Sequence, residues 1–390
     1  MIGGEHATAL PEYCLDDSLD TNYVVLGEGE QTLVDLAAAL EASTPLTEVN
    51  GLVLRDSNKF IHTSSRKRIR QIDRIPLPAW HLFPIEKYLD AQITFGVNLG
   101  RTMPMLASRG CPFQCTFCSN PVMYGTLWRP RSPADVLNEM LIYRDKYNVY
   151  SFDFYDLTAI VKRSWIKEFC NLIIEKKLGF SWQLPTGTRS EALDEEIIVL
   201  LRAAGCQYLV YAPESGSDKV LKMIKKKISL HSVRSSLRAA QKNQLGTKVN
   251  IIFGFPKETI KDIFISYKFI VQVAIIGVWD LSCFPFSPYP GSEIFNQLLK
   301  SNALSISDEY YNGLAQYTDP SKAVSYSENI SSFALPIFCT LGIVIFYVVS
   351  FAVRPMRLYR TARNLSKGIS ATKLESAIMR LQRKAVLGGS

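Results

Sequence analysis

Histidine is scarce in this sequence, and cysteine is sparse outside one short stretch. The 390 residues include four isolated histidines and eight cysteines. Five of the cysteines are scattered through mostly apolar segments, which is not the pattern of a disulfide framework. No N-terminal signal peptide is recognisable. These absences argue against a disulfide-stabilised secreted domain, and we expect a protein of a reducing compartment.

Acidic residues are almost missing from the C-terminal end. From Arg354 onward, nine Lys and Arg residues face one acid, Glu375, so this tail accounts for the whole net charge of +8. The rest of the chain is close to neutral. A basic surface spread over a domain is the usual footprint of nucleic-acid binding. The sequence therefore argues against a nucleic-acid partner.

Strand-like and helix-like patterns alternate between residues 104 and 300. Six apolar, β-prone runs, from "PMLAS" to "WDLSCFPF", are each followed by a helical pattern. Alternating strands and helices predict a parallel sheet with helices outside it. Six units predict an α/β fold, a partial (βα)6 TIM-type barrel. In such barrels the working residues follow the C-terminal ends of the strands.

Polar residues and glycines follow each of the six predicted strands, which indicates one active site at one end of the barrel. In chain order these positions are Cys111–Cys118, Asp156, Arg189, Glu214–Ser215–Gly216, Gly254–Glu258 and Ser287–Gly291.

Three cysteines, Cys111, Cys115 and Cys118, lie within eight residues in "RGCPFQCTFCSN". Thiolates on one loop can bind a soft metal centre. Structural zinc normally has four protein ligands, and neither a second cysteine pair nor a nearby histidine follows here. An iron–sulfur cluster with three thiolates keeps one iron open for a substrate or cofactor. A zinc-stabilised, membrane-tethered interaction protein without catalysis stays open as the alternative.

The Cys-x3-Cys-x-aromatic-Cys spacing, with Phe117 as the aromatic residue, resembles the signature of the radical S-adenosylmethionine (radical SAM) enzymes. The resemblance covers roughly residues 1–300 and includes "RPRSPADVLNEM", "APESGSDKVLKMI", "NIIFGFPKET" and "FSPYPGSEIF". These stretches are similar to the branch with an N-terminal cobalamin-binding domain. That branch includes radical methyltransferases and the anaerobic magnesium-protoporphyrin monomethyl ester cyclase.

The resemblance implies a cofactor set and an activity. Cys111, Cys115 and Cys118 would ligate a 4Fe–4S cluster whose open iron binds S-adenosylmethionine. An electron from the cluster would then cleave the sulfonium to give a 5′-deoxyadenosyl radical. The expected reaction modifies an unactivated carbon of a small molecule by methyl transfer or oxidative cyclisation, with a flavodoxin or ferredoxin as electron donor. An apolar substrate would be consistent with the apolar segment near the C-terminus.

Cofactor-binding positions are also implied by the resemblance. Asp156 would lie close to the amino group of S-adenosylmethionine, and Glu214 and Gly254 match the cofactor contacts after the fourth and fifth strands. Ser215 and Gly216 belong to the same "ESGS" stretch as Glu214. Alternatively, Glu214 and Ser215 mark the N-terminus of a helix, where the helix dipole favours the Glu214 carboxylate and Ser215 acts as the cap. For Gly254 it is a simple turn at the strand end.

The first 50 residues are similar to the closing part of a cobalamin-binding domain. Gly3 and Gly4 match a double glycine that abuts the nucleotide tail of the cofactor in the family. The family's Asp-x-His-x-x-Gly motif is not present, and His6 does not match it. We therefore expect an incomplete, Rossmann-like remnant that does not bind cobalamin alone, whether the start is truncated or another polypeptide completes it. An inactive, truncated homologue is a further alternative.

A charge-free run of 21 residues, Phe333–Val353, is long enough to cross a bilayer. A cytosolic barrel and a basic tail that stays inside conflict with one simple span. A re-entrant or in-plane helix, a helix packed under the barrel, or an exported tail would resolve the conflict. We expect membrane association at the cytoplasmic face. The alternative is a buried core helix followed by a solvated tail.

The predicted organisation has six parts. They are 1–50 (truncated cobalamin-binding-like domain), 51–100 (linker with a solvated basic run, "RKRIR"), 101–300 (barrel), 301–332 (connector), 333–353 (membrane-associated apolar helix) and 354–390 (basic amphipathic tail).

Overall fold

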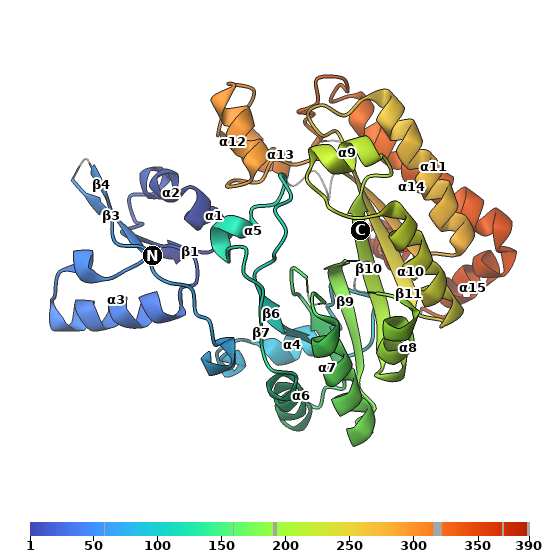
Figure 1. Cartoon of the computed structure of the whole chain (residues 1–390), viewed down its shortest axis with the longest axis horizontal. Helices are drawn as coiled ribbons and strands as arrows, with labels where there is room; N and C mark the ends of the chain where they lie inside the picture. The colour runs from blue at the N-terminus through green and yellow to red at the C-terminus, as the bar shows by residue number, and fades with distance from the viewer. Residues whose placement is uncertain (58, 159, 190–192, 315–321, 369, 388–390) are drawn as a thin grey trace. The chain divides into compact units, whose positions relative to one another are not determined.

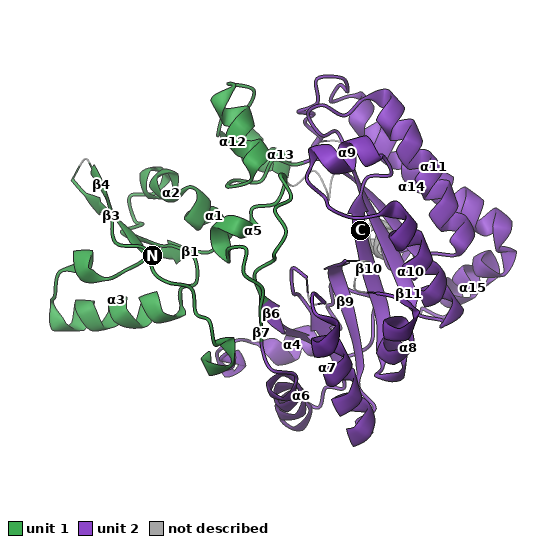
Figure 2. Ribbon diagram, in the orientation of Figure 1, with its two compact units in different colours: residues 1–76, 109–130, 287–315 green, residues 77–108, 131–286, 316–390 purple. Residues whose placement is uncertain are grey.

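The computed structural model describes residues 1–57, 59–158, 160–189, 193–314, 322–368 and 370–387 (Figure 1). The chain divides into two compact units (Figure 2). Unit 1 comprises residues 1–76, 109–130 and 287–315, and unit 2 comprises residues 77–108, 131–286 and 316–390. The predicted connector 301–332 includes residues 315–321, which lie outside the described residues.

Unit 2 is built on a six-stranded parallel sheet with the order β12-β11-β10-β9-β8-β5. The strands are buried apolar segments, as expected for a parallel sheet covered by helices. The prediction of an α/β fold with six parallel strands is confirmed. The strands are β5 (Thr102–Met105), β8 (Ser151–Phe154), β9 (Ser181–Thr188), β10 (Cys206–Glu214), β11 (Gly246–Phe253) and β12 (Asp280–Pro285).

Five of the six helices between these strands begin at a capping side chain, and α7 is the exception. Ser132, Asp194, Ser217, Ser229 and Thr259 each accept a hydrogen bond from the first turn of the helix that follows. These helices match the predicted helical stretches. In chain order the helices between β5 and β12 in this unit are α6 (Pro133–Tyr147), α7 (Arg163–Lys176), α8 (Glu195–Ala203), α9 (Asp218–Met223), α10 (Leu230–Lys242) and α11 (Ile260–Ile276).

The apolar run near the C-terminus forms helix α14 (Ala334–Val353), which packs against α11 and the edge strand β12 (Figure 1). Gly342 permits this contact, because a Cβ there would lie 2.8 Å from the Cys283 Sγ. Tyr267 donates a hydrogen bond to the Phe338 carbonyl at 2.8 Å, and Tyr347 donates to Asp280 at 3.2 Å. One face of α14 is therefore part of the barrel wall. Helices α15 (Pro355–Ser366) and α16 (Lys373–Leu387) follow.

Before the sheet, unit 2 contains η3 (Trp80–Leu82) and α4 (Ile85–Asp90).

Unit 1 contains a four-stranded sheet with the order β1-β2-β3-β4. Strands β1 (Ile2–Gly3) and β2 (Tyr23–Val25) are parallel, whereas β3 (Leu52–Asp56) and β4 (Lys59–His62) add to the sheet antiparallel. The structure thus places β3 and β4, which we assigned to the linker, in the N-terminal sheet. Leu52 and Leu54 bury their side chains with those of the neighbouring elements, which gives a physical reason for the difference.

The helices of unit 1 are short apart from α3. They are α1 (Glu5–Ala9), α2 (Pro11–Asp17), α3 (Glu30–Ala42), η1 (Leu46–Glu48), η2 (Ile72–Arg74), α5 (Asn120–Met123), α12 (Glu293–Lys300) and α13 (Asp308–Leu314).

Candidate active site

The three clustered cysteines lie on a loop of unit 1 that is closed at its base. Strands β6 (Ser108–Arg109) and β7 (Arg129–Pro130) pair at the two ends of this loop, which we call the cysteine loop (residues 109–130). Gly110 has φ +80°, and a Cβ there would lie 2.2 Å from the Leu127 carbonyl oxygen. A residue with a side chain would therefore force the base of the loop apart.

Cys111, Cys115 and Cys118 are partly buried, and no disulfide bond joins any of the eight cysteines, all of which are among the described residues. Burial raises the pKa of Cys118 to about 11, with smaller contributions from the neighbouring Cys115 and Cys111. The three thiols are thus close enough to interact electrostatically.

Within the described part of the chain, no group of three His, Cys, Asp or Glu residues is arranged to hold a single metal ion. Zinc needs its ligands around one centre. In a 4Fe–4S cluster, by contrast, each cysteine binds a different iron, so the ligands lie further apart. Three thiols on one loop supply three of the ligands that a 4Fe–4S cluster uses.

Other segments of unit 1 hold the cysteine loop along its length. The Ser119 hydroxyl donates a hydrogen bond to Glu5 at 2.5 Å, and the Ile294 amide donates to the Thr116 carbonyl at 2.9 Å. Gly291 lies against Val122, since a Cβ there would approach its side chain to 3.0 Å. The loop that carries the cysteines is therefore integrated into the core of unit 1.

Asp156 follows β8 and is fully buried. Its carboxylate accepts hydrogen bonds from the Ala107 amide at 2.9 Å and from the Ser108 hydroxyl at 2.5 Å. Burial raises its pKa to about 6, although these hydrogen bonds oppose the shift. The structure thus shows Asp156 holding the segment that leads from β5 toward the cysteine loop. Its predicted contact with the S-adenosylmethionine amino group stays a prediction.

Glu214 ends β10 with φ +70°, a left-handed conformation that non-glycine residues seldom adopt. Its carboxylate accepts a hydrogen bond from Lys226 at 3.0 Å, and the two side chains are 9% and 11% exposed. Burial raises the pKa of Glu214, and the Lys226 ammonium opposes this shift. Backbone strain and buried ion pairs occur often at functional sites, and the predicted cofactor contact of Glu214 stays a prediction.

Lys226 was not predicted as a site residue from the sequence. It lies in the run Lys225–Lys226–Lys227, twelve residues after Glu214, and nothing local in the sequence distinguishes it from its neighbours. Arg189, which follows β9, donates a hydrogen bond to the carbonyl of Lys227 from the same run. The loop after α9 thus covers the ends of β9 and β10.

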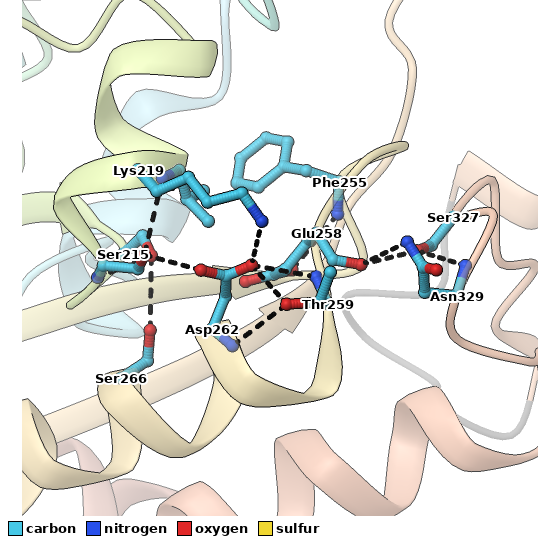
Figure 3. Close-up of polar contacts among 11 residues, drawn as sticks. Ser215, Lys219, Phe255, Glu258, Thr259, Asp262, Ser266, Ser327 and Asn329 are labelled. Carbon is cyan, nitrogen blue, oxygen red and sulfur yellow. Dashed lines mark hydrogen bonds and ion pairs between the residues drawn. The ribbon is translucent and has the colours of Figure 1, made fainter.

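Ser215 and Gly216 contact helix α11 (Figure 3). The Ser215 and Ser266 hydroxyls lie 3.2 Å apart, and the Gly216 amide donates to the Ser266 hydroxyl at 3.0 Å. A Cβ on Gly216 would lie 2.6 Å from the Phe269 Cβ, so only glycine fits this packing. These contacts give both residues a structural role, and their predicted cofactor contact stays a prediction.

Gly254 follows β11 with φ +91°, and its amide donates to the Glu258 carboxylate at 2.6 Å (Figure 3). The Phe255 amide donates to the same oxygen at 3.3 Å. The other oxygen, Oε1 of Glu258, is buried without a hydrogen-bond partner. Burial raises the pKa of Glu258 to about 8. Glu258 therefore shapes the turn at Gly254. From the sequence we predicted only that Glu258 follows the fifth strand, and we did not predict this role.

A second buried network in unit 2 was not expected from the sequence. Asp153 in β8 accepts a hydrogen bond from Gln183 in β9 at 2.6 Å. Gln183 in turn accepts from the Val97 amide at 2.9 Å and donates to its carbonyl at 2.8 Å. Both side chains hold a segment before β5 against the sheet, and their apolar surroundings in sequence gave no signal of this.

Gly3 and Gly4 lie at the start of unit 1. Gly3 belongs to β1 and pairs with Val25, and Gly4 has φ +98° at the N-terminus of α1. No described atom lies within 4 Å of a Cβ built on Gly4, so its backbone conformation is what requires glycine. His6 contacts the ring of Tyr311 edge-on at 5.3 Å. These residues fit a turn of an α/β sheet, and their predicted cobalamin contact stays a prediction.

A parallel α/β sheet together with a three-cysteine loop defines an iron–sulfur enzyme class, and the family comparison agrees. Residues 105–270 match the family described as the radical SAM superfamily. These residues of the chain therefore form a radical SAM domain. Proteins of this family bind a 4Fe–4S cluster and S-adenosylmethionine, and the predicted recognition is confirmed.

Individual relatives include both methyltransferases and a cyclase. The chain is 30% identical to the cytidylyl-2-hydroxyethylphosphonate methyltransferase of Streptomyces wedmorensis, over 80% of this chain and 62% of that protein. It is 27% identical to the anaerobic magnesium-protoporphyrin IX monomethyl ester cyclase of Rubrivivax gelatinosus, over 76% of this chain and 53% of the relative. The chain therefore spans between about half and two thirds of the length of these relatives.

Among solved structures, the radical S-adenosylmethionine methyltransferase TsrM of Kitasatospora setae, with cobalamin and a [4Fe-4S] cluster bound, has the same fold. The two structures superpose with a TM-score of 0.61 at 17% identity, over 77% of this chain and 57% of the other. At this identity the similarity shows the fold.

Proposed function

We propose that this chain is a radical SAM enzyme that modifies an unactivated carbon of a small molecule. The observation that carries the proposal is the cysteine loop, which has three cysteines in the family's spacing, none of them in a disulfide, inside a radical SAM domain. When bound, a 4Fe–4S cluster supplies the electron for reductive cleavage of S-adenosylmethionine. Cys111, Cys115 and Cys118 would hold the cluster and leave one iron for the cofactor.

The residues of unit 2 would prepare the strand ends for this cofactor. Glu258 fixes the turn at Gly254, and the buried Glu214 faces the ammonium of Lys226. Asp156 holds the backbone between Ala107 and Ser108 in place. These groups work mainly by position, since buried hydrogen bonds keep backbone and side chains from rearranging.

The relatives include a methyltransferase and a cyclase, so the proposed reaction is either methyl transfer or ring closure. Cobalamin is bound by the structural neighbour, and the proposal does not require it in this chain. Among the residues matched to cobalamin contacts, this chain supplies Gly3 and Gly4 and no match to the family's axial histidine. A flavodoxin- or ferredoxin-type reductant remains the predicted electron donor.

The test is metal analysis after anaerobic purification, with S-adenosylmethionine cleavage followed in the same sample. We expect a 4Fe–4S content of iron and sulfide, and 5′-deoxyadenosine formation that falls to background in Cys115→Ala. Cys14→Ala, a buried cysteine of unit 1 outside the loop, is the matched control and should keep both. Zinc without iron and no cleavage would establish the non-catalytic alternative, and cobalt in the sample would add cobalamin.

We also propose that the outer face of α14 rests on an anionic membrane surface, parallel to it. Ala334–Val353 is long and apolar enough to span a bilayer, and it is the one such helix among the described residues. Its inner face packs on the barrel, but Ile337, Leu341, Val344 and Val348 are 43 to 62% exposed. The basic helix α15 follows directly. Apolar side chains beside basic ones are typical of helices that lie in the membrane interface.

Vesicle flotation tests this membrane proposal. We expect the protein to float with phosphatidylcholine vesicles that contain phosphatidylserine, and less with phosphatidylcholine alone. Leu341→Ser combined with Val344→Ser and Val348→Ser should abolish flotation. Val34→Ser, at a 61% exposed position on α3, is the control and should float as the wild type does. Equal flotation of all three proteins would contradict the proposal.

A further inference from the structure

A buried carboxylate of unit 1 connects the N-terminal segment with both ends of the cysteine loop. Glu28 lies in the turn Gly27–Glu28–Gly29 between β2 and α3 and is 5% exposed. Its carboxylate accepts hydrogen bonds from Arg109 at 2.9 Å and from Arg129 at 2.8 and 3.0 Å. Arg109 precedes Cys111 by two residues, and Arg129 closes the loop in β7. We call these three residues the Glu28 bridge.

The two arginines also hold other parts of the loop region. Arg129 donates to the Ile69 carbonyl at 2.5 Å and to the Tyr124 carbonyl at 3.2 Å. Arg109 donates to Glu30 at 2.5 Å. Each guanidinium uses its two terminal nitrogens on different partners, and because its donors lie in one plane it fixes these partners relative to one another. The bridge therefore defines how the two ends of the loop are oriented.

The basic run "RKRIR", which we expected to be a solvated linker face, supports the same region. Arg68 donates to the Val122 carbonyl at 2.9 Å, just after the last cysteine. Its guanidinium fills the space beside Gly27, where a Cβ would lie 1.6 Å from Arg68 Nη1. Arg66 forms an ion pair with Asp35 at 2.5 Å. Arg66 and Arg68 of the run thus form partly buried contacts within unit 1.

We propose that Glu28 is a positioning residue for the cluster ligands. Its carboxylate orients the cysteine loop through Arg109 and Arg129, so the N-terminal segment has a role in the radical SAM centre that does not depend on cobalamin. This inference deepens the proposed function and rests on it, since it assumes that the loop holds a cluster. Glu28 itself lies outside the three ligands, and its effect is transmitted through the backbone of the loop.

The test compares three variants of the full chain. Glu28→Gln leaves two buried guanidinium groups without their anion and would destabilise unit 1. Glu28→Met combined with Arg129→Met removes one buried pair of opposite charges, and Arg109 keeps its ion pair with Glu30, so this double variant can keep its fold. Glu12→Gln is the control, because Glu12 is in the same unit, is 56% exposed at its side chain and pairs with His62 outside the loop.

Two readouts separate a role in positioning from a role in folding. The first is the electron paramagnetic resonance spectrum of the reduced cluster with and without S-adenosylmethionine, together with the rate of iron loss to a chelator. The second is hydrogen exchange of residues 109–130 in the apoprotein. We expect the folded double variant to lose iron about tenfold faster or more, as for other residues that orient metal ligands. We also expect an altered spectrum and faster exchange in the loop.

The outcomes are distinct. Wild-type iron loss and spectrum in the folded double variant would overturn the inference, even if exchange in the loop increased. If the wild-type protein binds no 4Fe–4S cluster, the proposed function fails. In that case the exchange measurement still decides whether Glu28 orders the loop, and unchanged exchange would overturn that part as well.

Discussion

The two units of this chain bury carboxylates in different ways. In unit 1, Glu28 lies between the guanidinium groups of Arg109 and Arg129. In unit 2, Asp156 and Glu258 are held by backbone amides and, for Asp156, a serine hydroxyl. Burial without a counter-charge favours the protonated form of a carboxyl group. Glu28 thus fixes a loop through two ion pairs, whereas Asp156 and Glu258 of unit 2 are carboxyl groups whose pKa values burial raises, so that their protonation responds to pH.

The largest effect that distinguishes the two arrangements is expected for Arg129→Met. The side chains of Arg129 and Glu28 are each 3% exposed, so the variant leaves a buried carboxylate with one cation instead of two. Breaking a buried pair by removing one partner costs about 3–5 kcal/mol of unfolding free energy. Urea denaturation of the anaerobic protein measures the change. A loss below about 1 kcal/mol, the value for exposed pairs, would show that Arg109 alone is sufficient for Glu28.

Glu258→Gln should have a smaller effect of opposite sign that depends on pH. The folded-state pKa of Glu258 is raised from 4.5 to about 8, so the wild-type protein loses stability as the pH rises through this window. Glutamine cannot ionise and retains an oxygen for the Gly254 amide. The stability of the variant relative to wild type should therefore increase by about 1.4 kcal/mol per pH unit, or about 3 kcal/mol from pH 6 to pH 8.

Denaturation curves at pH 6, 7, 8 and 9 check this expectation, and the difference should stop growing above about pH 8. Glu328→Gln, an exposed glutamate whose backbone contacts the same turn at Pro256, is the matched control. A constant difference between Glu258→Gln and wild type across the series would mean that Glu258 is already ionised at pH 6.

The two units also differ in how well their structure could be predicted from the sequence. The six strands and their helices were predictable because the alternation of apolar runs and capped helices is local, and the cysteine spacing lies within eight residues. The Glu28 bridge was not predictable, because it joins residues 81 and 101 positions apart. Glu28 in "GEGE" carried no sign of its partners. Unit 1 is assembled largely from such distant contacts, whereas the predicted parts of unit 2 depend on its local sequence.

Two other differences have the same cause. Strand β3 belongs to the N-terminal sheet because it pairs with β2, some 30 residues earlier, and β4 extends the sheet by pairing with β3. A short strand alone does not indicate where it pairs. The apolar run of α14 has a hydropathy that fits a membrane span. Its packing depends on Gly342, which allows close approach to Cys283 in β12. The apolar composition of this helix predicted a membrane contact, which the exposed face can make. It did not predict the packing of the other face against the sheet.

The smallest loss of stability is expected for Lys219→Met. This substitution removes an ion pair of unit 2 in which the cation is exposed and the anion is buried. Lys219 contacts Asp262 at 2.9 Å, and their side chains are 63% and 4% exposed. Burial alone would raise the pKa of Asp262, but hydrogen bonds from Thr259, Lys219 and Ser217 lower it to about 2. After loss of the lysine, Thr259 and Ser217 still donate to Asp262 (Figure 3). The carboxylate therefore stays ionised at neutral pH, and urea denaturation should show a loss below about 1 kcal/mol. If Lys219→Met lost as much unfolding free energy as Arg129→Met, exposure of the cation would not decide the strength of these ion pairs. The difference between the two pairs would then have to be explained by their geometry alone.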